Sequence, residues 1–248
     1  MGACSPPPPI KIGFIGGLTD RNSDNGQSGL NGVILAVEQF NRAGGVDGRL
    51  VELLPKDDAQ DKAVAAKSSE ELVAAQVEAV VGPFTSSMAQ VIVPITGAAG
   101  IFQVSPTITS MDFYGKDDNL FRINRTTRDN ARDYAQVMVG MGQKRVAVAY
   151  DTRNKNFTES WLTEFRTAAN ALGAELAAEV PYASGTDTDF DNRAGDHHDG
   201  MEYFGLSASG TADASSTVPA GLSLSDALVD GVYVAGEGVA LDGRDAAQ

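Results

Sequence analysis

Two short runs of serine and threonine contain the side chains best suited to binding a small ligand. The runs span 85–87 and 105–110, and each follows a short apolar stretch typical of a β-strand. The candidate ligand-binding hydroxyls are those of Ser86, Ser87, Ser105, Thr107 and Thr109. A hydroxyl donates to a carboxylate without carrying a charge of its own, which suits a ligand that must later be released.

The first of these runs also marks the start of a predicted helix, since Thr85, Ser86 or Ser87 can serve as its N-cap. A helix N-terminus offers unpaired backbone N–H groups and about half a positive charge, so it attracts an anion. In open parallel sheets ligands bind beyond the carboxyl ends of the strands, where both runs are expected. The alternative, in which the first run only caps a helix and the second is an ordinary turn, stays open.

Two further residues are weaker candidates for ligand contact. Asn25 falls in a polar stretch after the first predicted strand, where it could be a gate or part of a solvated loop. Phe157 ends the loop 151–157, where it could stack on a ligand or act as the staple residue of a helix starting at Thr158.

Short β-branched runs alternate with amphipathic stretches from Ile10 onward, which is typical of β-α units on a parallel sheet. Acidic residues between 57 and 61 can cap the second helix. The predicted strands cover 10–15, 50–54, 77–81, 101–104, 120–123, 145–150 and 174–180, the last stopped by Pro181. The sequence therefore predicts an α/β fold with parallel sheets flanked by helices.

The pattern divides the chain into three parts. A leader or tether spans 1–9, one α/β lobe spans 10–125, and a second α/β lobe spans 126–248. From about residue 191 glycine, alanine, serine and aspartate dominate and helical periodicity disappears. We therefore expect the second lobe to be atypical or truncated after about residue 190.

Composition limits the classes of partner. The chain has 248 residues, 42% of them hydrophobic, and a net charge of −14 from 19 Lys and Arg against 33 Asp and Glu. Such acidity disfavours nucleic acids and anionic membrane surfaces. No apolar run approaches the about 20 residues needed to span a bilayer.

Cofactor and metal chemistry are poorly supported. Gly13, Gly16 and Gly17 have the wrong spacing for a dinucleotide-binding turn, so a nucleotide-dependent enzyme is the less favoured alternative. The adjacent His197 and His198 are not spaced as helical metal ligands are. We expect no cofactor, no metal and no enzymatic activity.

The single cysteine, Cys4, follows two small residues and precedes a proline run. This arrangement is similar to the lipidation site of a bacterial lipoprotein, although a surface thiol in a leader is an equal alternative. A lipid anchor at Cys4 would be the chain's only link to a membrane.

Several motifs occur in a characteristic order. They are Gly29-Leu30-Asn31-Gly32, Asn41-Arg42-Ala43-Gly44-Gly45-Val46, Val81-Gly82-Pro83-Phe84-Thr85-Ser86-Ser87, Val104-Ser105-Pro106-Thr107-Ile108-Thr109, Phe121-Arg122-Ile123 and Val148-Ala149-Tyr150-Asp151. With them, segment 11–190 resembles the leucine/isoleucine/valine-binding family of type I periplasmic binding proteins. The resemblance implies a two-lobed fold that captures an amino acid or similar small carboxylate between its lobes.

The resemblance also implies a biological setting and specific contacts. Such a protein works in the periplasm or at the outer face of the cell envelope and delivers its ligand to an ABC transporter permease. Ser86, Thr107 and Thr109 match family positions that contact a ligand's carboxylate and ammonium groups. The loop 151–157 is expected to face the first lobe, and 228–235 looks like a late strand of the family. A ligand-sensing receptor domain of the same fold is the main alternative.

Overall fold

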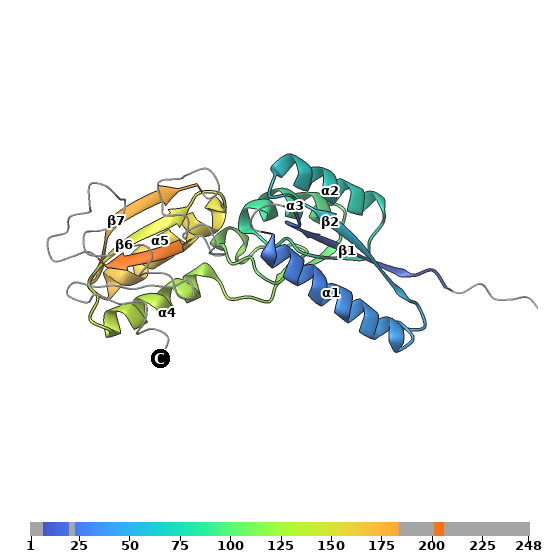
Figure 1. Ribbon diagram of the computed structural model, residues 1–248, viewed down its shortest axis with the longest axis horizontal. Helices are drawn as coiled ribbons and strands as arrows, with labels where there is room; N and C mark the ends of the chain where they lie inside the picture. Colours follow the sequence, from blue (N-terminus) through green and yellow to red (C-terminus); the bar gives the residue numbers. More distant parts are fainter. Residues whose placement is uncertain (1–6, 20–22, 184–200, 206–248) are drawn as a thin grey trace, which may run out of the picture. The chain divides into compact units, whose positions relative to one another are not determined.

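The computed structural model describes residues 7–19, 23–183 and 201–205 (Figure 1). The chain forms two compact units: unit 1 consists of Met1–Thr109 and Gly115–Asn124, and unit 2 of Ser110–Tyr114 and Arg125–Gln248. The predictions for Cys4, His197, His198 and the strand 228–235 lie outside the described residues.

Unit 1 is built on a five-stranded sheet in which every pairing is parallel. Its strands are β1 (Ile10–Gly16), β2 (Val51–Asp57), β3 (Ala79–Val81), β4 (Phe102–Ser105) and β5 (Leu120–Arg122), in the order β2-β1-β3-β4-β5. Because all five strands point the same way, their carboxyl ends meet at one edge of the sheet, and the loops that leave them converge there.

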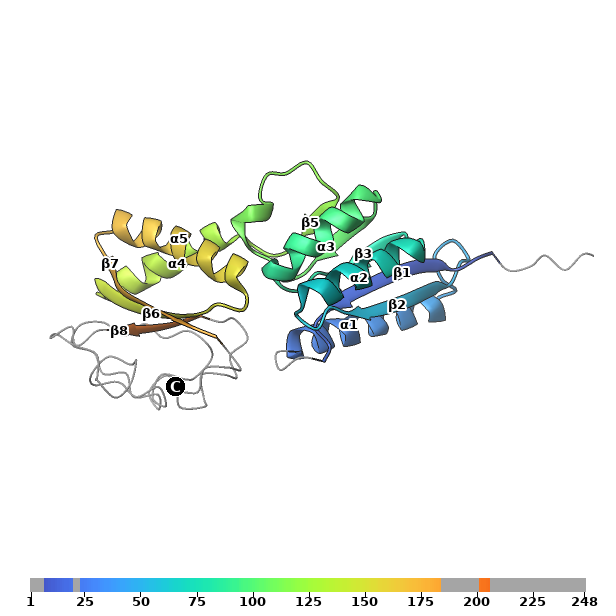
Figure 2. The same ribbon diagram turned by 90° about the horizontal axis from the view of Figure 1, so that it is seen from above.

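Two helices cover one face of this sheet (Figure 2). They are α2 (Lys62–Ala74) and α3 (Ser86–Ala98). Ile15 and Val80 from the sheet pack there against Leu72 of α2 and Ile92 of α3, all four fully buried. The Asp61 side chain caps α2 by accepting from the amides of Ala63 and Val64, as the acidic stretch predicts.

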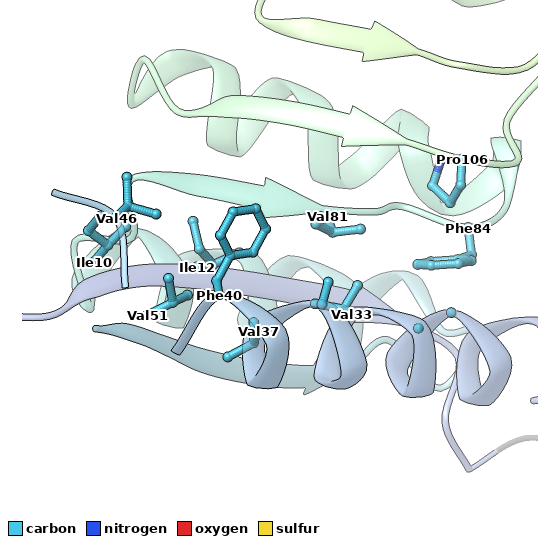
Figure 3. A pocket seen from close by; sticks show the side chains of 13 residues that line it. Ile10, Ile12, Val33, Val37, Phe40, Val46, Val51, Val81, Phe84 and Pro106 are labelled. Atoms are coloured by element: carbon cyan, nitrogen blue, oxygen red, sulfur yellow. The ribbon is translucent and has the colours of Figure 1, made fainter. Parts of the chain in front are cut away.

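The opposite face of the sheet carries a single helix of the described part of unit 1, α1 (Asp24–Arg42) (Figure 2). An apolar groove of about 530 Å³ runs along α1, lined by residues such as Val33, Phe40 and Val81 (Figure 3). Phe40 is 56% exposed, and Phe121 on β5 is 54% exposed. Much apolar surface on this side of unit 1 is therefore left uncovered.

Helix α1 is anchored near both of its ends. Near its start, a Cβ at Gly26 would lie 1.9 Å from the Gly17 carbonyl oxygen, so only glycine allows the backbones to approach this closely. Near its end, the Asn41 side chain accepts from the Val51 amide (2.8 Å) and donates to the Val51 carbonyl (2.9 Å). Val51 begins β2, the edge strand of the sheet, which also contains Pro55.

Unit 2 has a smaller, mixed sheet. Its strands are β6 (Arg145–Asp151), β7 (Glu175–Tyr182) and β8 (Met201–Gly205), in the order β7-β6-β8, with η1 (Met111–Phe113), α4 (Thr127–Gly140) and α5 (Lys155–Ala171). Strands β6 and β7 are parallel, whereas β8 is antiparallel to β6. Met138 of α4, Val148 of β6 and Trp161 and Phe165 of α5 form its core.

The α/β class with helix-flanked parallel sheets is confirmed, with local corrections. Helix α1 begins at Asp24, so Asn25 lies in its first turn and not in a loop. The prediction that Pro181 stops a strand is wrong, because β7 continues to Tyr182. Strand β7 lies at a sheet edge, where a residue without an N–H is tolerated. No described helix is long and apolar enough to cross a membrane.

Candidate ligand-binding site

The site begins where β3 leaves the sheet of unit 1. Gly82 has φ 125°, and a Cβ there would lie 2.1 Å from the Ile15 carbonyl oxygen, so the turn into α3 requires glycine. Phe84 follows, buried against Phe14 with ring centroids 5.1 Å apart. This packing fixes the N-terminus of α3 at the carboxyl edge of the sheet.

The N-cap residue of α3, Thr85, makes no capping hydrogen bond to the first turn of the helix. Thr85 has the extended backbone of an N-cap, but its side chain accepts no hydrogen bond from the helix. The first intrahelical bond runs from the Ala89 amide to the Thr85 carbonyl (3.0 Å), so the preceding amides have no acceptor within the helix. No acidic residue lies in this turn. The positive end of the helix dipole can therefore attract an anion.

The two serines of the first run are buried at this point. Ser86 is 2% exposed and Ser87 is 4% exposed. Across the part of the chain that the structure describes, the Ser86 hydroxyl takes part in no hydrogen bond. Ser86 therefore keeps a donor and an acceptor beside the helix N-terminus.

The second run lies against the segment that precedes α3. The Ser105 hydroxyl donates to the Pro83 carbonyl (2.7 Å), and the Thr107 hydroxyl donates to the Phe84 carbonyl (2.6 Å). The Ile108 amide donates to the Ser105 hydroxyl oxygen (3.2 Å). Ser105 and Thr107 thus hold the loop beside the N-terminus of α3, and their donor protons are already in use.

Thr109 differs from these two anchoring residues. Its side chain is 5% exposed, and its hydroxyl has no hydrogen-bond partner among the described residues. A buried hydroxyl without a partner costs about 1–3 kcal/mol, which a ligand group could recover. Of the predicted hydroxyls, those of Ser86 and Thr109 are thus the ones with unused hydrogen-bonding capacity.

A polar network joins the end of β2 to α3, and the sequence analysis missed it. Asp58 is fully buried, and its Oδ1 accepts from the Gln60 amide (2.8 Å) and from Gln60 Nε2 (3.0 Å). The Thr85 hydroxyl donates to Gln60 Oε1 (3.0 Å). Gln60 and Thr85 are 25 residues apart, so no local sequence pattern could have indicated the pairing.

Asp57, at the end of β2, fixes the loop that follows β1. Its carboxylate accepts from the Leu18 amide (2.8 Å), the Ala59 amide (2.8 Å) and the Thr19 hydroxyl. Burial raises the pKa of Asp57, but these hydrogen bonds, that from Thr19 foremost, outweigh burial and hold the pKa below the ordinary value of 3.8. Asp57 is therefore a structural anion that belongs to the edge of the site.

The two weaker candidates have other surroundings. Asn25 is exposed in the first turn of α1. Phe157 lies within α5 and packs against the core of unit 2, and the helix starts at Lys155, three residues before the predicted start at Thr158. Ligand contact by Asn25 or Phe157 stays a prediction. Among the residues described, no group of three or more His, Cys, Asp or Glu could hold a metal ion.

A parallel sheet with an open helix N-terminus and buried hydroxyls at its carboxyl edge defines a class of α/β proteins that bind small ligands. Residues 9–221 match the family model described as periplasmic binding protein. The chain belongs to the periplasmic binding protein family.

Three known proteins illustrate the similarity. The Leu/Ile/Val-binding protein homolog 3 of Brucella melitensis is 30% identical over 184 residues, which is 73% of this chain. The substrate-binding protein BasB of a Halobacterium salinarum chemotactic signal transduction system is 33% identical over 161 residues, 62% of this chain. The structure of LivJ of Streptococcus pneumoniae, a branched-chain amino acid transporter substrate-binding protein in complex with isoleucine, is 27% identical over 80% of this chain, with a TM-score of 0.67.

These similarities confirm the resemblance to Leu/Ile/Val-binding proteins and the type I periplasmic-binding-protein fold. The similar regions cover 49% of the Brucella relative, 38% of BasB and 56% of LivJ. The chain thus spans about half the length of the proteins that it matches.

Proposed function

We propose that this chain is an extracytoplasmic solute-binding protein for an amino acid or a similar small carboxylate, without enzymatic activity. The observation that carries the proposal is the open N-terminus of α3, with the uncommitted Ser86 hydroxyl in its first turn and the loop that leads to Thr109 beside it. The similarity to a Leu/Ile/Val-binding protein homolog of Brucella melitensis and to LivJ in complex with isoleucine supports the same class of ligand.

The physical argument favours a carboxylate. Backbone amides at a helix N-terminus and neutral hydroxyls each donate to an anionic oxygen, and hydrogen bonds to a charged group are worth about 1.5–3 kcal/mol each. Neither Ser86 nor Thr109 needs to break an existing hydrogen bond to do so. Ser105 and Thr107 would act indirectly, by holding the loop in place.

The proposed setting follows from the family. The ligand would be passed to an ABC transporter permease, in the periplasm or at the outer face of the cell envelope, with Cys4 as a candidate site for a lipid anchor. Asn25, Ser87 and Phe157 remain proposed secondary contacts.

Ligand sensing is a second candidate function, supported by the similarity to BasB, a protein of a chemotactic signal transduction system. The same binding chemistry would then feed a signalling partner instead of a permease. Neighbouring genes for permease and ATPase subunits would favour transport, whereas a neighbouring receptor gene would favour sensing.

Calorimetry on the 248-residue chain tests the proposal directly. We expect binding of leucine, isoleucine or valine, and much weaker binding of leucinamide, which lacks the carboxylate. At about 100 times its dissociation constant a ligand stabilises the folded state by about 2.7 kcal/mol, which a thermal-shift screen detects.

A double variant, Ser86→Ala with Thr109→Ala, should lose most of this affinity and remain folded. Thr163→Ala is the matched control, because that hydroxyl lies exposed on α5 and donates to the Glu159 carbonyl. Equal binding of leucine and leucinamide, or unchanged affinity in the double variant, would refute a carboxylate site at α3.

A further inference from the structure

The backbone of Thr85 has the conformation of a helix N-cap, but its side chain makes no capping hydrogen bond. Its φ of −125° and ψ of 145° are those in which a threonine side chain normally accepts from the second or third helical amide. Thr126, the N-cap of α4, does this by accepting from the Asp129 amide (3.2 Å). At α3 the equivalent donor would be the Met88 amide, but the Thr85 hydroxyl is turned to Gln60 Oε1 (3.0 Å).

A hydrogen bond to Asp58 holds the Gln60 side chain so that its Oε1 faces the Thr85 hydroxyl. Its Nε2 donates to Asp58 Oδ1 (3.0 Å), and because a carboxylate can only accept, the amide must turn its oxygen the other way, toward Thr85. The backbone is fixed too, since the Gln60 amide donates to the same Oδ1 (2.8 Å) and Gln60 has a left-handed φ of 51°. Asp58 is fully buried, so bulk water does not compete with Gln60 for its Oδ1.

We infer that Gln60 is a positioning residue that prevents Thr85 from capping α3, so that the Met88 amide in the first turn stays available to an anionic ligand. The inference rests on the proposed carboxylate site. Gln60 does not touch the ligand in this scheme; it acts by diverting the hydroxyl that would otherwise compete for the Met88 amide.

The effect of a Thr85 cap on ligand affinity can be predicted, because the cap and the ligand would compete for the Met88 amide. An N-cap hydrogen bond changes an equilibrium constant by about five-fold, and a ligand would have to displace it before binding. Removal of Gln60 Oε1 should release the Thr85 hydroxyl to cap α3. Ligand affinity should then fall by about five-fold.

The experiment compares Gln60→Met, which keeps the side-chain length, with the double variant Gln60→Met/Thr85→Val, which has no hydroxyl left to cap the helix. With leucine as the probe in calorimetry, the single variant should bind about five-fold more weakly. The double variant should recover most of the wild-type affinity, and Thr85→Val alone should bind as the wild type does.

A second measurement separates this role from a general loss of structure. Hydrogen exchange at the Met88 amide should slow in ligand-free Gln60→Met, because that amide gains an acceptor, and should return to the wild-type rate in the double variant. Gln27→Met is the matched control, since Gln27 is an exposed glutamine of unit 1 whose Nε2 donates to the Leu18 carbonyl (2.8 Å). It should change neither quantity.

The outcomes are distinguishable. Unchanged affinity and exchange in Gln60→Met, or equal weakening in the single and double variants, would overturn the role of Gln60. If the wild-type chain binds neither leucine nor any other small carboxylate, the proposed function fails. The exchange rate of the Met88 amide would then still decide whether Gln60 keeps α3 uncapped.

Discussion

Replacing Thr109 by valine should change stability and affinity in opposite directions. Valine keeps the shape of threonine and removes the hydroxyl, which is buried and without a partner among the described residues. In the ligand-free protein an unpartnered buried hydroxyl costs about 1–3 kcal/mol, so Thr109→Val should raise the free energy of unfolding of unit 1 by about 1 kcal/mol. With ligand bound, the same change removes a donor to the carboxylate, so the dissociation constant should rise about ten-fold.

The assay must follow unit 1 alone. The single tryptophan, Trp161, lies in unit 2, so its fluorescence is unsuitable. Hydrogen exchange at amides of β1 and β3 reports the opening free energy of unit 1, since these strands run through its core. Calorimetry with leucine gives the affinity of each variant.

Thr107→Val is the matched control for this prediction. It makes the same chemical change two residues away, but the Thr107 hydroxyl donates to the Phe84 carbonyl (2.6 Å). We therefore expect Thr107→Val to lower stability by about 1 kcal/mol. If Thr109→Val lowers stability as much as Thr107→Val does, the Thr109 hydroxyl is satisfied without a ligand and the reasoning is wrong.

Two further predictions concern the scaffold of unit 1. Gly26→Ala should lower the free energy of unfolding by about 1–3 kcal/mol in a urea titration, because its Cβ would lie 1.9 Å from the Gly17 carbonyl oxygen. Gly32→Ala, with nothing within 4 Å of its Cβ, should instead be neutral or stabilising. Because the folded pKa of Asp57 is lowered from 3.8, its contribution to stability is present above that pH and lost as the pH falls through the folded pKa. Asp57→Asn should therefore flatten the acid limb of a stability-versus-pH curve, and an unchanged limb would contradict this.

Local patterns were sufficient to predict much of the fold and the positions of several candidate site residues. Apolar runs that alternate with amphipathic stretches predicted the strands and helices of unit 1, and serine and threonine after two strands predicted where the hydroxyls gather. These features depend on residues adjacent in sequence. The corresponding elements, such as β3 and α3, therefore lie within a few residues of their predicted positions.

Features that depend on tertiary context were not predictable in the same way. The sequence allowed Thr85 to cap α3, but Gln60, 25 residues earlier, takes its hydroxyl. The sequence predicts a loop at Asn25 because that residue follows the first strand, yet close packing of Gly26 on Gly17 allows a helix to start at Asp24. Similarly, Pro181 would end the strand only if a neighbouring strand required an N–H donor at that position. Whether it does depends on the position of β7 in the sheet.

The two contacts that Asn41 makes with Val51 also affect how unit 1 meets other protein molecules. An edge strand normally exposes a row of donors and acceptors on which a foreign strand can assemble, and this is a common route to aggregation. On β2 the Asn41 amide already occupies both backbone groups of Val51, and Pro55 has no N–H to offer. Sheet extension from this edge would lack its regular ladder of hydrogen bonds, so β2 is protected against fibril-like growth.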